Sequence, residues 1–289
     1  MAEPTPSFLA SPSRPKLKLP AGACDTHVHV FGPHKIFPFA EPRPFTPADA
    51  PKDKLFALHA MLGVERCVIV QSTCHGYDNR VVADAIAAKG GAYCGVALVP
   101  PTVADADLRR LDALGFRGAR FNFVTHLGVG TPPAEAIALS ARLAPLGWHL
   151  QVHFAPELID ELATFLLRSA VPVVIDHMGR VDASLGVDQP AFRSLLELMR
   201  DARFRVKVSG SERISRKASP WPDARPFARA LVAEFGDRCF WGSDWPHPNL
   251  AVIPDDGVLV DLLSEIAPSE AQRRALLVDN PLRFYRFGQ

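Results

Sequence analysis

This sequence of 289 residues has almost no net charge, no long hydrophobic run and no paired cysteines. Its 32 basic residues nearly balance 31 acidic residues, for a formal charge of +1, so we expect no nucleic-acid partner. No segment approaches the roughly 18 consecutive apolar residues of a membrane span. The N-terminal segment also lacks the apolar core and cleavage site of a signal peptide. We therefore predict a cytoplasmic protein with no membrane partner.

The five cysteines are scattered along the chain and odd in number. They are Cys24, Cys67, Cys74, Cys94 and Cys239, and no two form a CxxC pair. Three of them lie inside apolar, strand-like runs, where small buried thiols are common. This pattern predicts reduced thiols rather than a disulfide framework.

Short β-rich runs alternate with amphipathic, helix-length segments along most of the chain. The predicted strands are 24–30, 65–72, 93–99, 116–123, 149–154, 171–177, 204–210 and 238–245. Clear helical patterns include 134–145, 156–169 and 222–236. Alternation of this kind favours a parallel sheet with right-handed crossovers. Eight such units in under 300 residues predict an α/β fold, a single (β/α)8 TIM-type barrel.

An open Rossmann-like sheet is the alternative, but no GxGxxG follows the first predicted strand. We find no internal linker and no low-complexity tract. We therefore predict one catalytic barrel domain over residues 22–289. Residues 1–21 are rich in Pro, Ser and Lys without periodicity, which predicts an irregular arm.

Three connections are too long for simple turns. The first, 31–51, is proline-rich and without periodicity, so we expect it to fold over the barrel mouth as an active-site loop. Two further long loops are expected at 211–222 and 246–258.

Polar residues end nearly every predicted strand. In a barrel these ends face the active site, and buried strand ends without a site would not carry so many ionisable groups. The residues are His27, His29, Gln71, Ser72, His75, Arg120, Asn122, His153, Asp176, His177, Arg180, Lys207, Ser209, Arg213, Asp244 and His247.

The first strand contains a His-x-His pair, His27 and His29. Strand side chains alternate between faces, so both histidines point to one side, about 6.6 Å apart along the strand. Two imidazoles at that distance can converge on one metal ion. His153 lies in another apolar strand, and Asp244 lies between two tryptophans, where a carboxylate is costly to bury without a cation or hydrogen-bond donors.

Seven segments together carry a family resemblance. They are Asp-Thr-His-Val-His-Val-Phe-Gly-Pro at 25–33, Val-Ile-Val-Gln-Ser-Thr-Cys-His-Gly at 68–76, Arg-Phe-Asn-Phe at 120–123, Val-Ile-Asp-His-Met-Gly-Arg at 174–180, Trp-Gly-Ser-Asp-Trp-Pro-His-Pro-Asn at 241–249, Ile-Pro-Asp-Asp-Gly at 253–257 and Asn-Pro at 280–281. The chain resembles the amidohydrolase superfamily, and within it the branch of the 2-pyrone-4,6-dicarboxylate lactonases.

The resemblance implies a hydrolase that opens a carboxylated lactone, either 2-pyrone-4,6-dicarboxylate-like or derived from an aromatic or sugar acid. It implies that Asp244 is the general base and that His27, His29 and His177 polarise the lactone carbonyl. It further implies a group of residues that hold the carboxylates or nearby oxygens of a small anionic substrate. These are Ser72, Arg120, Arg180, Arg213 and Asn249.

The chain departs from the lactonase pattern at two places. Val124-Thr125-His126 stands where that pattern has a further substrate-binding arginine, and His153 stands where it has a tyrosine. His153 restores a histidine that zinc-binding relatives use. With His27, His29 and Asp244 it predicts one divalent metal ion, zinc. The alternative is a metal-independent site in which the histidines hydrogen-bond the carbonyl.

Other functions remain compatible with the resemblance. Related barrels include lactone isomerases and metal-dependent decarboxylases, and a barrel without activity could bind a small molecule. A binding protein has no need for an aspartate and several histidines at one barrel mouth, so hydrolysis is the leading interpretation.

Overall fold

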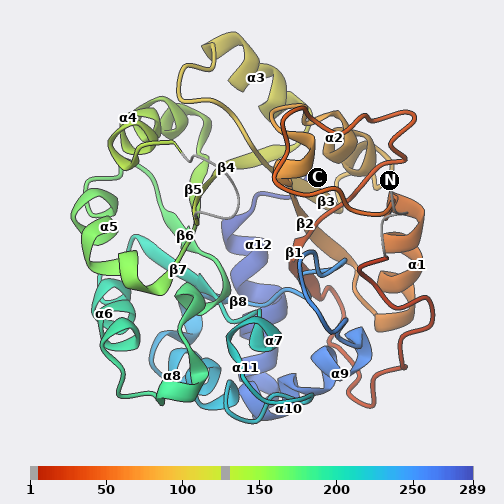
Figure 1. The fold of residues 1–289 in the computed structure, drawn as a ribbon, viewed down its shortest axis with the longest axis vertical. Coiled ribbons are helices and arrows are strands. Elements are labelled where there is room, and N and C mark those ends of the chain that lie inside the picture. Colours follow the sequence, from red (N-terminus) through yellow and green to blue (C-terminus); the bar gives the residue numbers. More distant parts are fainter. Residues whose placement is uncertain (1–5, 125–130, 289) are drawn as a thin grey trace.

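The computed structural model describes residues 6–124 and 131–288. These residues form one parallel sheet in which the strands follow chain order from β1 to β8, seen along the barrel axis in Figure 1. The strands are β1 Cys24–Val28, β2 Arg66–Val70, β3 Tyr93–Ala97, β4 Phe116–Phe123, β5 His149–Phe154, β6 Val173–Ile175, β7 Phe204–Lys207 and β8 Cys239–Phe240. Each lies within one of the predicted runs, so the predicted strand order is confirmed.

Backbone hydrogen bonds join the last segment to the first strand. The Thr26 N–H donates to the Trp241 carbonyl at 2.9 Å, and the Asp244 N–H donates to the His27 carbonyl at 2.8 Å. This contact closes the sheet, which makes the fold a (β/α)8 barrel and excludes the Rossmann-like alternative. It also places Asp244 directly beside the His-x-His strand.

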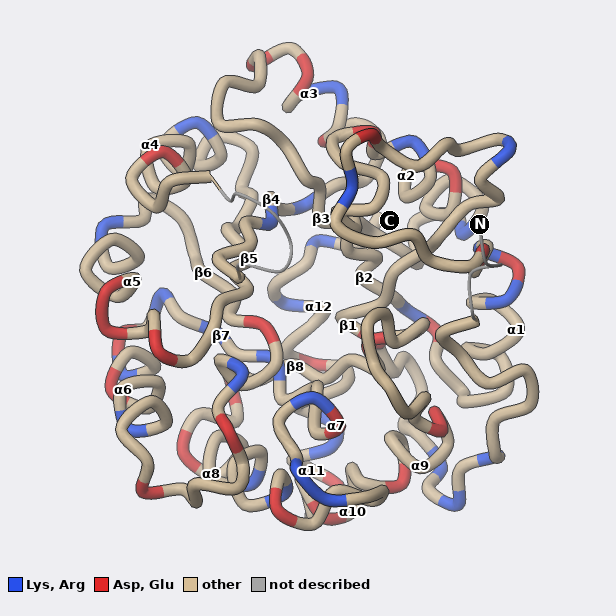
Figure 2. Tube along the Cα trace, in the orientation of Figure 1, with Lys and Arg blue, Asp and Glu red and all other residues tan. Residues whose placement is uncertain are grey.

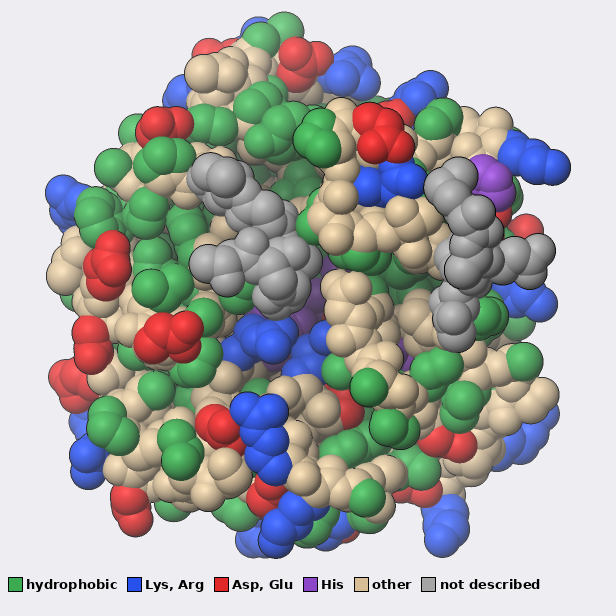
Figure 3. All heavy atoms as spheres, in the orientation of Figure 1, with side chains coloured by type: hydrophobic (Ala, Val, Ile, Leu, Met, Phe, Trp, Pro, Cys, Tyr) green, Lys and Arg blue, Asp and Glu red, His purple; other side chains and the backbone are tan. Residues whose placement is uncertain are grey.

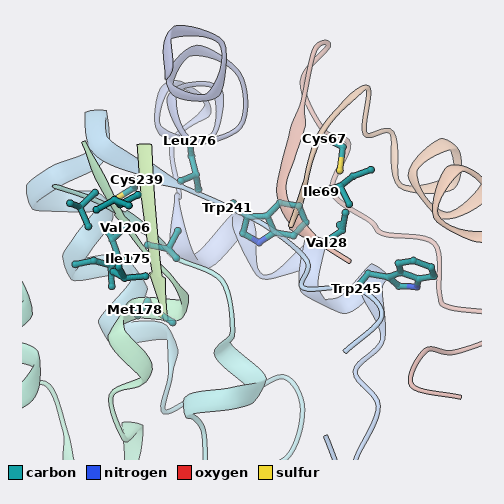
Figure 4. Packing of buried hydrophobic residues seen from close by; sticks show 14 of the residues in the cluster. Val28, Cys67, Ile69, Ile175, Met178, Val206, Cys239, Trp241, Trp245 and Leu276 are labelled. Carbon is teal, nitrogen blue, oxygen red and sulfur yellow. The ribbon is translucent and has the colours of Figure 1, made fainter. Parts of the chain in front are cut away.

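Alternation along the strands divides the core in two. In β2, Val68 and Val70 point into the barrel, where they join a cluster of apolar side chains. Cys67 and Ile69 point outward into the larger cluster beneath the helices, as Figure 4 shows for the outer layer. Successive strand residues face opposite sides of a sheet, and strands buried on both faces read as continuous apolar runs.

Most of the helices surround the sheet as an outer ring, whereas the C-terminal helix lies at the centre of the view in Figure 1. Their bounds are α1 Lys52–Leu62, α2 Arg80–Ala87, α3 Asp105–Ala113, α4 Pro133–Leu143, α5 Ile159–Leu166, α6 Pro190–Met199, α7 Ser211–Ile214, α8 Arg225–Phe235, α9 Asp256–Asp261, α10 Leu263–Ile266, α11 Glu270–Arg274 and α12 Asn280–Phe284. The predicted helical patterns at 134–145, 156–169 and 222–236 correspond to α4, α5 and α8. No helix in the described part of the chain has the length and apolar character that crossing a bilayer requires.

The C-terminal segment fills the end of the barrel at which the strands begin. Tyr285, directly after α12, is fully buried and packs with Cys24, Val174 and Phe240 inside the barrel. Large apolar side chains therefore close this end, and the opposite end, where the strands finish, is the one open to a ligand.

Irregular segments are held against the barrel by specific contacts. Within the predicted arm, the backbone N–H of Ser13 donates to the Asp255 carboxylate at 3.0 Å, and that of Lys16 donates to Asp261 at 2.7 Å. The division of the chain at residue 22 stays a prediction. Acidic and basic residues both occur around the outer helices (Figure 2), and all five cysteines are buried and free.

Candidate active site

The predicted site residues meet where the strands end. Segments following β6 and β8 adopt backbone angles that non-glycine residues rarely take, with φ from 48° to 65°. The residues with this conformation there are His177, Met178, Arg180, Asp244, His247 and Asn249. Such conformations cost about 1–3 kcal/mol each and cluster at functional sites. Their position here holds the imidazole and carboxylate groups over the barrel mouth.

Glycine is required where the segment after β8 passes β1. A Cβ atom on Gly242 would lie 2.6 Å from both the backbone N and the Cβ of His27. The absence of a side chain therefore lets the segment that carries Asp244 pack directly against His27.

Three imidazoles surround one carboxylate oxygen. The Nε2 atoms of His27, His29 and His177 lie 3.6, 3.5 and 3.8 Å from Oδ1 of Asp244. All four side chains are almost completely buried. The structure thus brings together the four residues that we predicted as catalytic.

The other nitrogen of each imidazole has its own partner. His29 Nδ1 lies 2.7 Å from the carbonyl of Val70, and His177 Nδ1 lies 3.0 Å from the Ser209 hydroxyl. These contacts fix the rings so that Nε2 faces Asp244. The Nδ1 atom of His27 faces a buried lysine, Lys207, at 3.1 Å.

Arg213 binds the second oxygen of Asp244 through its Nε atom. Burial alone would raise the pKa of Asp244, but the Arg213 guanidinium and the neighbouring imidazoles outweigh it and hold that pKa well below its usual range. Burial, followed by the charge of Lys207, lowers the pKa of His27 to about 3. Burial likewise lowers the pKa of His177. At neutral pH the site therefore combines an ionised aspartate with neutral His27 and His177.

A small pocket lies above this cluster. Histidine and basic side chains are visible at the bottom of a hollow near the centre of Figure 3. The pocket is lined by His29, Phe45, Ser72, Thr73, Arg120, His153, His177, Arg180, Arg213, Asp244, Pro248 and Asn249. It contains all five predicted substrate-binding residues, while His27 lies fully buried beneath it.

The three arginines of the pocket differ in their partners. Arg120 donates from Nε to Asp176 at 3.0 Å, and Arg213 binds Asp244. Arg180 makes no ion pair with a carboxylate among the described residues, and its NH1 atom lies 3.4 Å from His153 Nε2. Burial and the neighbouring Arg213 charge lower the pKa of Arg180. An anionic ligand would relieve this repulsion between cations.

A divalent ion fits a donor set that shares His27 and Asp244 with the predicted one and has His177 where we predicted His29 and His153. The role of His29 as a metal ligand stays a prediction. Ligand atoms of His27, His177 and Asp244 lie within 4.8 Å of one another. The distances from Asp244 Oδ1 to the Nε2 atoms of His27 and His177 are 3.6 and 3.8 Å. They are close to the separation of neighbouring ligand atoms in a tetrahedral zinc site, where each bond to zinc is about 2.0–2.1 Å. His27 Nε2 has no hydrogen-bond partner among the described residues. The three residues therefore form a candidate metal site.

His153 is oriented differently. Its Nδ1 atom lies 3.2 Å from the Asn122 side-chain oxygen, and its Nε2 atom faces Arg180, so its ring sits at the arginine side of the pocket. Its role as a metal ligand stays a prediction. The other departure, at 124–126, lies largely outside the described residues.

Sequence reasoning gave no role to three residues of the site. Phe45 lies in the long 31–51 loop and lines the pocket, which is consistent with the predicted position of that loop at the mouth. Asp176 and Lys207 were recognised only as polar strand ends. The signal for Lys207 was a charged residue between two valines in a buried strand.

Comparison with known proteins places the chain in a family. The amidohydrolase family model matches residues 24–287. The chain is 46% identical to the 2-pyrone-4,6-dicarboxylate hydrolase of Comamonas testosteroni, over 98% of this chain and 97% of that protein. It is 41% identical to the 4-sulfomuconolactone hydrolase of Hydrogenophaga intermedia, over 94% and 90% of the two chains.

A solved structure agrees with these relatives. A crystal structure of a probable 2-pyrone-4,6-dicarboxylic acid hydrolase from Acinetobacter baumannii, with citric acid bound, superposes with a TM-score of 0.82. It shares 26% sequence identity, and the match covers 92% of this chain and all of that chain. The chain belongs to the amidohydrolase family. Within that family its relatives come from the lactonase-like branch that the sequence resembles.

Proposed function

We propose that this protein is a hydrolase that opens the ring of a small carboxylated lactone by attack of an activated water on the ring carbonyl. The observation that carries the proposal is Asp244 Oδ1 at the centre of three imidazole Nε2 atoms, directly beneath a pocket with three arginines. An ionised carboxylate can accept the proton of water, and neutral imidazoles can hydrogen-bond the carbonyl oxygen as it becomes negative.

The relatives support this class of substrate. The names of the Comamonas and Hydrogenophaga proteins describe hydrolases of a dicarboxylate pyrone and a sulfonated lactone. The Acinetobacter structure holds citric acid, which is also a polycarboxylate. Arginine suits such groups because its planar fork matches a carboxylate. The proposed contacts for the substrate anion are the five predicted residues of the pocket, Ser72, Arg120, Arg180, Arg213 and Asn249.

Arg213 links substrate binding to the base. In the structure it neutralises Asp244, which makes that carboxylate a weak proton acceptor. A substrate carboxylate that binds Arg213 shares its positive charge, so the basicity of Asp244 rises when the substrate is present. One water is consumed, the acyl C–O bond breaks, and the ring oxygen receives a proton.

The test of this proposal is turnover on a panel of carboxylated lactones, followed by proton release in weakly buffered solution. Hydrolysis forms a new carboxylic acid that ionises, so one proton should appear for each ring opened. Isomerisation would consume the substrate without releasing a proton, decarboxylation would evolve carbon dioxide, and a binding protein would do neither. Any of these three results in place of proton release would contradict the proposal.

We further propose that His27, His177 and Asp244 hold one divalent ion, with zinc as the expected metal and with His29 and His153 as further ligands. When bound, such an ion lowers the pKa of its water toward about 7. The protein residues position that water and receive its proton.

Protein purified from zinc-supplemented cells is accordingly expected to contain about one metal equivalent. His177→Asn should reduce the bound metal, because it removes one of three grouped donors. His153→Asn tests whether His153 is a ligand. If it is, this variant should also bind less metal, and if it is not, the metal content should be unchanged. If the protein contains no metal and keeps its activity in the presence of a strong chelator, the site is metal-independent and this proposal is wrong.

A further inference from the structure

Lys207 is a fully buried lysine with no place in the pocket lining. It ends β7 between Val206 and Val208, and its exposed fraction is 0%. An ammonium group in such a position is costly unless each of its three protons has an acceptor. It lies under the site, so it acts through other residues rather than on the substrate.

The three protons of Lys207 have three acceptors. Its Nζ atom lies 2.9 Å from the carbonyl of Thr26, 2.9 Å from Oε1 of Gln151 and 3.1 Å from Nδ1 of His27. Asp176 Oδ1, at 3.6 Å, adds a nearby negative charge. Because an ammonium can only donate, His27 Nδ1 must be the acceptor in this contact.

A neutral imidazole that accepts at Nδ1 carries its proton at Nε2. In His27, Nε2 is the atom that faces Asp244 Oδ1 at 3.6 Å. We propose that Lys207 is a positioning residue that fixes His27 as the Nε2–H tautomer, so that His27 enters the active site as a hydrogen-bond donor. The role of this hydrogen-bond donor in lactone opening rests on the proposed function, whereas the assignment of the tautomer rests on the contacts of His27 alone.

His29 provides an opposite case within the same site. Its Nδ1 atom faces the carbonyl of Val70 at 2.7 Å. A carbonyl can only accept, so His29 carries its proton at Nδ1 and offers the Nε2 lone pair to the cavity. In the metal-free site, the two histidines of the His-x-His pair therefore have different roles: His27 donates to the developing oxyanion, and His29 can accept a hydrogen bond from the attacking water.

Asp176 competes with Lys207 for His27. Its Oδ1 atom lies 3.2 Å from His27 Nδ1 and could accept a proton from that nitrogen. Removing Lys207 should therefore move the proton from Nε2 to Nδ1. Metal binding through His27 Nε2 would require the same movement, with Asp176 as the acceptor.

The test is two-bond 1H–15N correlation spectroscopy of the full chain with 15N-labelled histidine rings, in metal-free protein without substrate. Loss of signals in His27→Asn and His29→Asn assigns the two rings. We expect the Nε2–H pattern for His27 and the Nδ1–H pattern for His29 in the wild type. In Lys207→Met, His27 should change to the Nδ1–H pattern. Lys52→Met, which removes a partly exposed lysine on α1, should change neither ring.

An Nδ1–H pattern for His27 in the wild type would overturn the proposal, as would an unchanged pattern in Lys207→Met. If Lys207→Met does not fold, Lys207→Leu, which also lacks a donor, serves in its place, and the wild-type spectrum alone still decides the tautomer. Kinetics separate this proposal from the function: Lys207→Met should lower kcat with little change in KM. A wild type that turns over no lactone would contradict the function and leave the tautomer assignment standing.

Discussion

Asp244→Asn is expected to lower kcat for the lactone substrate by at least about 100-fold, the lower range for loss of general acid–base catalysis. The amide keeps the shape of the carboxylate but cannot accept a proton from water. His27 and His177 would still face this position, so carbonyl polarisation should persist. The measurement is steady-state kinetics with saturating substrate.

The control for this variant is Asp107→Asn, which changes an exposed aspartate on α3 and should retain full activity. Thermal unfolding of both variants checks the fold, since Asp244→Asn leaves Arg213 without its buried carboxylate. Asp244 is not the base if Asp244→Asn remains folded and keeps more than about a tenth of wild-type kcat.

Arg180→Met is expected to lower kcat/KM for a carboxylated lactone by about 10- to 100-fold, mainly through KM. Hydrogen bonds to charged groups contribute about 1.5–3 kcal/mol, and Arg180 is the pocket arginine without a carboxylate partner among the described residues. Because no such ion pair is broken, the fold should be unaffected. Kinetics on a carboxylated lactone and on its neutral ester analogue give the comparison.

The neutral analogue separates binding from structure. Wild type and Arg180→Met should turn over the neutral ester equally, and Arg168→Met, at an exposed position on the barrel surface, should match the wild type on both substrates. Equal loss on both substrates would assign Arg180 a structural role. Arg120 is a poorer choice for this test, because Arg120→Met would also leave Asp176 without its 3.0 Å partner.

The fold followed from the sequence because its periodicity carries the physical information. Buried parallel strands read as apolar runs, and each alternates with an amphipathic helix. Several predicted strands are longer than the strands of the structure. The run predicted at 238–245, for example, contains the two-residue strand β8, Cys239–Phe240. Asp244 lies in this extra part, where the backbone leaves the strand conformation to turn into the site.

The site was predictable as a set of residues, but its pairings were not. Strand alternation predicted that His27 and His29 would share a face, and both do turn Nε2 toward Asp244. No spacing in the sequence could indicate that Arg213 neutralises Asp244, because that contact joins the short helix α7, which stands where we expected a long loop, to the segment after β8. The same holds for Phe45, which reaches the pocket from an aperiodic loop.

Ring opening in 18O-labelled water tests the central claim most directly. If Asp244 activates water to attack the lactone carbonyl, mass spectrometry should find one 18O atom in each product, located in the newly formed carboxylate. The rate of incorporation should match the rate of substrate loss and fall with it in Asp244→Asn. A product that forms at the same rate without 18O, or that carries the label on the hydroxyl oxygen, would contradict activated-water hydrolysis at this site.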